Sequence, residues 1–205
     1  MRKFFVTGIG TDVGKTFVSA ILVEALGADY WKPVQTGSFY GTDRELIQKL
    51  ISREDSILHS EVYNFEQPVS PHYAAAIANS KIEIDKILIP ETQNKNMVIE
   101  GAGGVMVPID EAGHFMIDLI EKLECEVVLV SQNYLGSINH SLLTIQAIHN
   151  RGLKIGTLIF NGPRNESSEK IIIAACQANK VKYVNKETIV GKETILKYSA
   201  DFREI

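Results

Sequence analysis

Continuous runs of apolar residues alternate along the chain with segments whose apolar positions recur every three or four residues. Runs such as residues 4–6 and 127–130 are typical of strands that are buried on both faces. The three- and four-residue spacing, clearest over residues 17–26, is typical of amphipathic helices. Their alternation predicts an α/β fold of the P-loop type, with a mostly parallel sheet flanked by helices on both faces.

The expected elements cover most of the chain. We expect strands at residues 4–6, 29–36, 96–100, 127–130 and 155–160. We expect helices at residues 17–26, 43–51, 74–78, 115–123, 137–150 and 192–198, a weaker one at 83–88, and one that ends at Ala178. Thr42 is the expected N-cap of the second helix, Ser167 or Ser168 of the helix ending at Ala178, and Gly27 the stop of the first helix. Residues 52–71 lack periodicity and are expected to form a loop. With no repeat or linker, residues 1–205 are expected to form one domain.

The glycine-rich stretch from Gly8 to Thr16 lies between the first strand and the first helix. Such a turn points backbone N–H groups inward, and the helix N-terminus adds partial positive charge. Lys15 can reach the outer phosphates of a nucleotide, and the Thr16 hydroxyl can hold Mg²⁺. The first glycine stands six residues before Gly14, one more than the usual spacing. The stretch predicts binding of a nucleoside triphosphate with Mg²⁺.

Other polar segments also follow expected strands, and ligands of open parallel sheets bind beyond the carboxyl ends of the strands. Those segments are residues 32–37, 100–104, 132–137 and 161–163. Lys32 precedes Pro33, which biases it toward an extended conformation. We expect Lys32 at an exposed rim of the site, although a solvated lysine at a strand end fits the sequence equally well.

Two carboxylates are candidate metal ligands. Glu100 is expected to close a strand, where a nucleotide hydrolase often places the carboxylate that holds Mg²⁺. A glutamate bonded to a neighbouring N–H is the alternative. Asp43 could be a second ligand, but an ordinary first-turn acid of a helix explains it better from spacing alone. Turn capping likewise explains Thr36 as well as substrate contact does. The helix start at Gly136-Ser137 could bind an anion or only water.

Composition narrows the classes of partner. The net charge of −4 argues against nucleic acid or an acidic membrane surface as a main partner. No apolar run approaches eighteen residues, and the N-terminus reads as a strand rather than a signal peptide. Cys125 and Cys176 lie in apolar surroundings, which is typical of reduced core residues in a cytoplasmic protein.

Seven segments together resemble the dethiobiotin synthetase family. They are Val6 to Thr16, Trp31 to Ser38, Thr42-Asp43, Ser70 to His72, Ile99 to Gly104, Leu135 to His140, and Phe160-Asn161. The long-spaced phosphate loop, the Lys-Pro-Val and the Glu-Gly-Ala-Gly-Gly are jointly specific. The resemblance implies a ligase that closes the ureido ring of dethiobiotin from 7,8-diaminopelargonic acid (7,8-diaminononanoate), CO₂ and ATP. It implies a carbamate and a carbamic–phosphoric anhydride as intermediates, and ADP and phosphate as products.

The resemblance also implies roles for particular residues. Lys32 would be the catalytic lysine, and Lys15 would bind the phosphates. Mg²⁺ would be held by Thr16, Asp43 and Glu100, while Thr11 and Thr36 would touch the diamine or its carbamate. Further nucleotide contacts would come from Asp12, Val13, Gly14, Phe17, Gly101, Ala102, Gly103 and, at the adenine, Asn161. Family members are homodimers, and a helix start corresponding to Gly136, Ser137, Ile138 and Asn139 reaches the substrate carboxylate across the interface.

The chain departs from the family pattern in two places, one at the diamine end of the site and one at the base end. The loop from Gly37 to Asp43 is short, which leaves less cover over the diamine. From about residue 181 the chain diverges, and Asn185 to Gly191 replaces an Ile-Pro-containing loop that packs on the base. We therefore expect looser discrimination among nucleoside triphosphates than strict use of ATP.

A partition-type ATPase switch is the main alternative, because it shares the P-loop fold. Its signature lysine would fall at Gly10, so that residue is missing here. A GTP-binding switch would need an Asn-Lys-x-Asp motif, whereas Asn161 is followed by Gly162 and Pro163. A binding module without catalysis would need neither Lys32 nor the glycines after Glu100.

Overall fold

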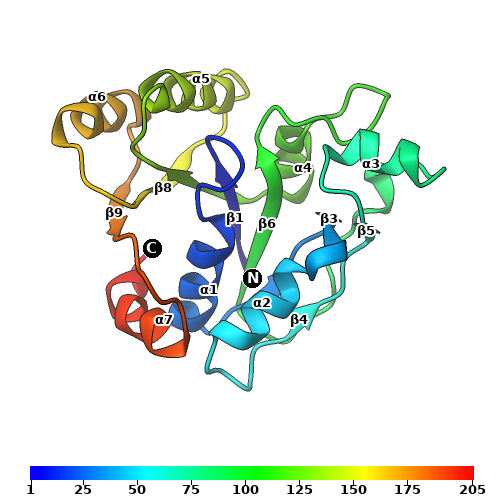
Figure 1. Ribbon diagram of the computed structural model, residues 1–205, viewed down its shortest axis with the longest axis horizontal. Helices are drawn as coiled ribbons and strands as arrows, with labels where there is room; N and C mark the ends of the chain where they lie inside the picture. Colours follow the sequence, from blue (N-terminus) through cyan, green and yellow to red (C-terminus); the bar gives the residue numbers. More distant parts are fainter.

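The computed structural model describes residues 1–205, and seven parallel strands form its central sheet (Figure 1). The order across the sheet is β4-β2-β6-β1-β7-β8-β9. Their bounds are β1 (Arg2–Gly8), β2 (Asp29–Trp31), β4 (Leu58–His59), β6 (Asn96–Gly104), β7 (Glu126–Ser131), β8 (Ile155–Asn161) and β9 (Lys180–Val184). All neighbouring pairs run parallel. The predicted α/β fold with a parallel sheet is confirmed.

Helices cover both faces of this sheet (Figure 1). On one face α1 (Lys15–Leu26) packs against α2 (Asp43–Leu50) and α7 (Lys192–Ser199). The other face carries α4 (Met116–Leu123), α5 (Ser137–Asn150) and α6 (Glu166–Cys176). This division follows from right-handed crossovers, because the chain moves one way from β1 to β2 and the other way from β6 to β9.

The strand expected at residues 29–36 is two strands in different sheets. β2 ends at Trp31, and β3 (Val34–Thr36) pairs instead with β5 (Tyr63–Phe65) in a small parallel sheet. Pro33 has no N–H to donate to a ladder, so the chain leaves the main sheet at Lys32. The loop expected at residues 52–71 is wrong in the same region, since it contains β4 and β5. The helix α3 (Pro71–Ile77) follows and packs on this small sheet.

Helix boundaries agree with the sequence where capping is local. Thr42 caps α2 in a capping box with Glu45, and Gly27 ends α1 in a left-handed conformation, as predicted. The expected cap at Ser167 or Ser168 is wrong, because the Asn165 side chain accepts from the Ser168 N–H at 3.1 Å. The weak helix expected at residues 83–88 is only a 3₁₀ turn at Ile84–Lys86. Two further 3₁₀ turns lie at Ser38–Tyr40 and Ala200–Phe202.

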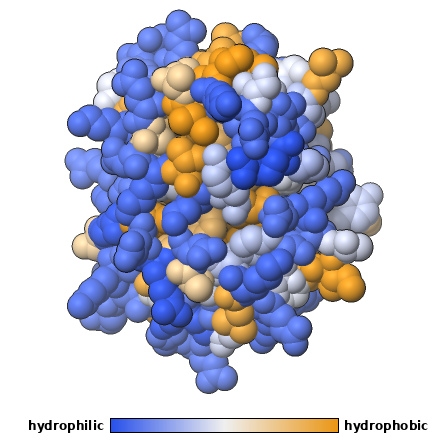
Figure 2. Space-filling view, turned by 90° about the vertical axis from the view of Figure 1, so that its left-hand side faces the viewer, coloured by the Kyte–Doolittle hydropathy of each residue, from blue (hydrophilic) through white to orange (hydrophobic).

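Apolar residues of the central strands form the core, and β1, β6 and β7 are buried along most of their length. Cys176 is buried and Cys125 half-buried, and neither forms a disulfide. Burial raises the pKa of the Cys125 thiol to about 12 and that of Cys176 to about 11. None of the helices combines the length and hydropathy needed to cross a bilayer. Figure 2 shows the face around α6, β9 and α7, which is mostly hydrophilic with a hydrophobic group in its upper half.

Candidate active site

The glycine-rich loop joins β1 to α1 at the carboxyl edge of the sheet, toward which the arrowheads of β1 and β6 point in Figure 1. At Gly8 a Cβ would lie 2.5 Å from a methyl group of Val13. At Gly14, where φ is 93°, a Cβ would lie 2.0 Å from Nδ2 of Asn161. Asn161 Nδ2 donates to the Val13 carbonyl oxygen at 2.9 Å. The end of β8 therefore contacts the loop and holds it in place. A side chain at Gly8 or Gly14 would clash, so both positions require glycine.

Lys15 folds back over this loop. Its Nζ donates to the carbonyl oxygen of Gly10 at 2.8 Å, and the side chain is buried. Burial lowers the pKa of Lys15 from its ordinary value, although Glu100 and Asp43 oppose that effect. Its acidic neighbours offset the cost of burying this ammonium group only in part. A bound phosphate group would supply further negative charge beside it.

Thr16, Asp43 and Glu100 lie together beside the loop. The Thr16 hydroxyl lies 3.1 Å from Asp43 Oδ1 and 2.9 Å from Glu100 Oε1. Glu100 does not close its strand as expected, because β6 continues to Gly104 and the side chain is only 1% exposed. The donor set is therefore two carboxylates and a hydroxyl, all oxygen, which is the set that a hard cation such as Mg²⁺ prefers.

Lys32 lies between the two carboxylates rather than at an exposed rim. It is 6% exposed, donates to Asp43 Oδ2, and lies 3.3 Å from Glu100 Oε1. The expected exposed position is wrong, because the side chain is buried in contact with Asp43 and Glu100. Burial by itself lowers the pKa of Lys32, but Glu100 and Asp43 together hold the pKa above its ordinary value. The carboxylate pair thus already holds a cation, the ammonium group of Lys32.

Strand register and helix capping bring these groups together. Trp31 pairs with Ile99 between β2 and β6, so the next residues, Lys32 and Glu100, fall side by side. Gln35 Oε1 accepts from the backbone N–H of Asp43 at 3.1 Å and thereby fixes the start of α2. Gln35 was not predicted, and its only signal in the sequence is its place between Lys32 and Thr36.

Tyr30 is a second residue that the sequence analysis missed. It is fully buried in β2, and its hydroxyl donates to Glu100 Oε2 at 3.1 Å. Burial, together with the charges of Glu100 and Asp43, holds the pKa of Tyr30 well above its ordinary value. An apolar strand pattern contains no signal for this role, since a buried tyrosine in β2 is expected from packing alone.

A cavity of about 480 Å³ opens over these groups and gathers most of the predicted site. The predicted residues that line it are Thr11, Asp12, Gly14, Lys15, Thr16, Lys32, Thr36, Asp43, Glu100, Ala102 and Gly103. Gln35, Gly37, Gly41 and Pro68 complete the wall.

The other predicted nucleotide contacts lie outside this cavity. Val13 and Asn161 form the hydrogen bond described above. Phe17 packs edge-on against Tyr198, with ring centroids 6.1 Å apart. A Cβ at Gly101 would lie 2.7 Å from the Phe5 ring, so this glycine allows close packing in the core.

The predicted carboxylate-binding segment at the start of α5 is separate from the phosphate loop. Gly136 and Ile138 line another cavity, of about 450 Å³, with residues 133–135 and 163–165. Ser137 is buried and its Oγ accepts from the Tyr134 N–H at 3.2 Å. The cavity over the phosphate loop therefore contains no residue of this segment from its own chain.

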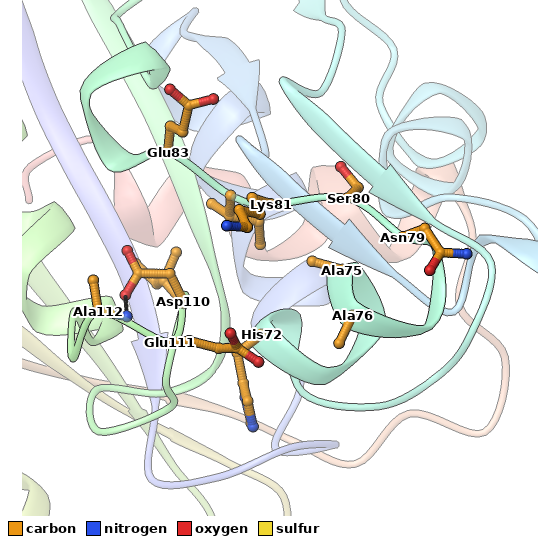
Figure 3. Close-up of a pocket in the computed structure, with 12 residues that line it drawn as sticks. His72, Ala75, Ala76, Asn79, Ser80, Lys81, Glu83, Asp110, Glu111 and Ala112 are labelled. Carbon is orange, nitrogen blue, oxygen red and sulfur yellow. Dashed lines mark hydrogen bonds between the residues drawn. The ribbon is translucent and has the colours of Figure 1, made fainter.

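A further cavity of about 430 Å³ lies between α3, residues 79–83 and residues 109–112 (Figure 3). His72, from the Ser-Pro-His segment, is among its lining residues. The charged residues that line this cavity are of both signs: Lys81 is basic, and Glu83, Asp110 and Glu111 are acidic. It contains no residue of the phosphate loop and is separate from the cavity over Lys15 and Glu100.

The fold and site define a P-loop nucleotide-binding protein, in which a glycine-rich loop and two carboxylates meet at the carboxyl edge of a parallel sheet. A family model described as an AAA domain matches residues 2–194. Over 199 residues the chain is 46% identical to the ATP-dependent dethiobiotin synthetase BioD of Cytophaga hutchinsonii, covering 97% of this chain and 96% of that protein. The BioD of Christiangramia forsetii is 45% identical over 204 residues, which cover 99% of this chain and 97% of that protein.

The chain therefore belongs to the dethiobiotin synthetase family, as its motifs indicated. It is an enzyme of the ligase class that forms carbon–nitrogen bonds. Among solved structures, a ParA family ATPase from Chlorobium tepidum is similar, with a TM-score of 0.58, 15% sequence identity and 97% of each chain covered. At that identity the likeness shows the fold alone.

Proposed function

We propose that this chain closes the ureido ring of dethiobiotin, in biotin biosynthesis, from 7,8-diaminopelargonic acid, CO₂ and ATP. The observation that carries the proposal is the meeting of Lys15, Lys32 and the Thr16–Asp43–Glu100 group in one cavity. A nucleotide switch needs the phosphate loop and a metal ligand. It has no need for a second buried lysine at the position where an acceptor of the phosphoryl group would lie.

The proposed reaction has three balanced steps. One amine of the diamine adds to CO₂ and loses a proton, giving a carbamate. A carbamate oxygen then attacks the γ-phosphorus of ATP, and the bond to ADP breaks, giving a carbamic–phosphoric anhydride. Finally the second amine attacks the carbamoyl carbon, the carbon–oxygen bond to phosphate breaks, and that amine loses a proton as the ring closes.

The charges of the cavity suit the second step. Phosphoryl transfer is catalysed chiefly by positioning and by stabilising charge on the transferred group. Lys15 would bind the phosphates, while Thr16, Asp43 and Glu100 would hold Mg²⁺, which neutralises phosphate charge when bound. If Asp43 and Glu100 held the metal, Lys32 would no longer be needed to neutralise them and could face the carbamate and the γ-phosphate. Lys32 would thereby stabilise negative charge on both.

The diamine end of the substrate would be bound by Thr11 and Thr36, which line the same cavity. Its carboxylate would be bound by the start of α5, residues 136–139, of a second copy of the chain. The absence of that segment from the cavity of its own chain supports binding across a homodimer interface. Leu135, fully exposed beside Gly136, gives this end of the helix an apolar surface for such an interface.

At the base, Asn161 would contact adenine. Its Nδ2 is committed to Val13, which leaves Oδ1 free to accept from an exocyclic amine. The segment after Val184, which replaces the family's Ile-Pro loop, is exposed at Asn185 and Lys186. We therefore expect looser discrimination among nucleoside triphosphates, measured by direct competition with ATP as one of the competitors. A strong and exclusive preference for ATP would refute this expectation.

The test of the function is product formation. The protein is incubated with ATP, Mg²⁺, bicarbonate and the diamine, and dethiobiotin is sought by mass spectrometry. The proposal expects dethiobiotin and an ADP release that depends on the diamine. Hydrolysis of ATP at the same rate without diamine, and no dethiobiotin, would favour a switch of the partition type. A partition ATPase would have its signature lysine at Gly10. A Cβ at Gly10 would meet nothing within 4 Å, so there is room for a side chain there and packing does not explain why the lysine is missing.

A further inference from the structure

Tyr30 contacts a different oxygen of the Glu100 carboxylate from the one that Thr16 and Lys32 contact. Tyr30 lies in β2 and pairs with Val98, which is two residues before Glu100 in β6. Side chains two residues apart in a strand share a face of the sheet. The tyrosine hydroxyl therefore reaches Glu100 from within the core, beneath the cavity.

The two oxygens of the Glu100 carboxylate have different partners. Oε1 faces the cavity, 2.9 Å from the Thr16 hydroxyl and 3.3 Å from Lys32 Nζ. Oε2 accepts from the Tyr30 hydroxyl at 3.1 Å. Without Tyr30, Oε2 would have no partner among the described hydrogen bonds, in a side chain that is 1% exposed. A buried carboxylate oxygen without a donor is unfavourable, and rotation of the group toward another donor would relieve it.

We propose that Tyr30 is a positioning residue: its hydroxyl fixes the orientation of the Glu100 carboxylate so that Oε1 is presented to the metal of Mg·ATP. The inference rests on the proposed function in one respect, the assignment of Glu100 as a ligand of Mg²⁺. Groups that hydrogen-bond to metal-binding side chains commonly set their orientation, and losing such a group weakens metal affinity or activity by about 10- to 100-fold.

A purely structural role is the competing explanation. A buried tyrosine needs a hydrogen-bond acceptor, and Glu100 could serve only to satisfy it. In that case removal of the hydroxyl would change the stability of the protein without changing its affinity for metal. The two explanations therefore differ in a quantity that can be measured without turnover.

The experiment compares Tyr30→Phe with the unmodified protein. Phe keeps the ring and removes only the hydroxyl. Mn²⁺ affinity is measured by electron paramagnetic resonance with a saturating non-hydrolysable ATP analogue, which also stabilises the folded state, and thermal unfolding is recorded on the same samples. We expect about tenfold weaker Mn²⁺ binding, with turnover largely recovered at high Mg²⁺. Unchanged or tighter Mn²⁺ binding in the folded variant would contradict the proposal.

Two further variants make the result specific. Tyr63→Phe is the control, because the Tyr63 hydroxyl also forms a hydrogen bond, accepting from the Glu83 N–H at 3.0 Å, but outside the cavity. We expect its Mn²⁺ affinity to be unchanged. Glu100→Gln tests the underlying assignment. If Glu100→Gln leaves the affinity unchanged, the metal site itself is wrong. If Glu100→Gln weakens binding and Tyr30→Phe does not, only the role of Tyr30 fails.

Discussion

Lys32 shows how one side chain can serve two states of the site. Without nucleotide it neutralises Asp43 and Glu100, which would otherwise be two carboxylates facing each other in a partly buried site. With a metal cation in that place, the same ammonium group would be available for the substrate. The state with metal and substrate is a proposal. The metal-free state, in which Lys32 pairs with both carboxylates, implies that loss of Lys32 destabilises the protein.

Lys32→Ala is expected to lower turnover by about 100-fold or more, because a group that stabilises transition-state charge is lost. It is also expected to lower the free energy of unfolding of the metal-free protein by about 3 kcal/mol, because two carboxylates lose their partner. Thermal unfolding with and without Mg²⁺ checks the second effect, and Mg²⁺ should restore part of the stability. Lys86→Ala, which removes an exposed ion pair with Glu83, is the control. Near-normal turnover in Lys32→Ala would overturn its role.

Lys15→Ala is expected to weaken triphosphate binding by about 100-fold while the fold is kept. The reason is that its ammonium group is the one directed along the phosphate loop, where it now contacts Gly10. Titration with a fluorescent ATP analogue measures the affinity. An unchanged affinity would count against the loop as the nucleotide site.

At the scale of elements, β2 is anchored at its start by a buried polar cluster. Asp29 is fully buried and accepts from the Ile57 N–H at 2.8 Å and from the side chains of Thr92 and Asn94. His59 Nε2 lies 3.2 Å from the same carboxylate. These contacts join β2, β4 and the segment before β6. Burial alone would raise the pKa of Asp29, but the hydrogen bonds, led by that from Thr92, hold the pKa below its ordinary value.

Asp29→Asn is therefore expected to lower the free energy of unfolding by about 2 kcal/mol at neutral pH. Because the folded-state pKa is lowered, the carboxylate contributes its stability above the ordinary aspartate value of about 3.9, and that stability is lost as the pH falls through the folded-state pKa. Urea unfolding between neutral and acid pH should show a smaller pH dependence in the variant. Asp201→Asn, at an exposed position, should match the unmodified protein. Equal pH dependence in both variants would contradict the assignment.

The sequence predicted elements well where their signals are local. The phosphate loop, the capping box at Thr42 and the Gly27 stop are each specified within a few residues. The break between β2 and β3 was missed, because residues 29–36 were expected to form one strand although Pro33, which has no N–H for the ladder, lies within them. The buried position of Lys32 and the contact of Tyr30 with Glu100 depend on the register between β2 and β6, which joins residues about seventy positions apart. Local pattern carries no information on that register.

At the scale of the whole molecule, one chain presents two parts of the proposed site in separate places. The phosphate loop and Lys32 share one cavity, and the start of α5 lines another. A homodimer that places the second cavity of one copy beside the first of its partner would complete the site twice, through one two-fold interface.

Leu135→Glu is expected to disrupt this dimer, because it places a charge on the exposed apolar tip beside Gly136. Sedimentation should show the unmodified protein at twice the mass of the chain and the variant at the mass of one chain. The KM for the diamine should rise about tenfold or more, while ATP binding stays the same. Leu88→Glu, an exposed position away from α5, is the control. A monomeric unmodified protein with full activity would rule out a shared site.

The proposed function depends above all on one step, in which the γ-phosphoryl group of ATP passes to a carbamate oxygen in the cavity formed by Lys15, Lys32 and the Thr16–Asp43–Glu100 group. The most direct measurement uses bicarbonate labelled with ¹⁸O, mixed rapidly with the protein, diamine, Mg²⁺ and ATP in unlabelled water. We expect one labelled oxygen in the released phosphate for each dethiobiotin formed, because the attacking carbamate oxygen leaves with the phosphate. Phosphate that carries only oxygen from ATP and water would contradict this step.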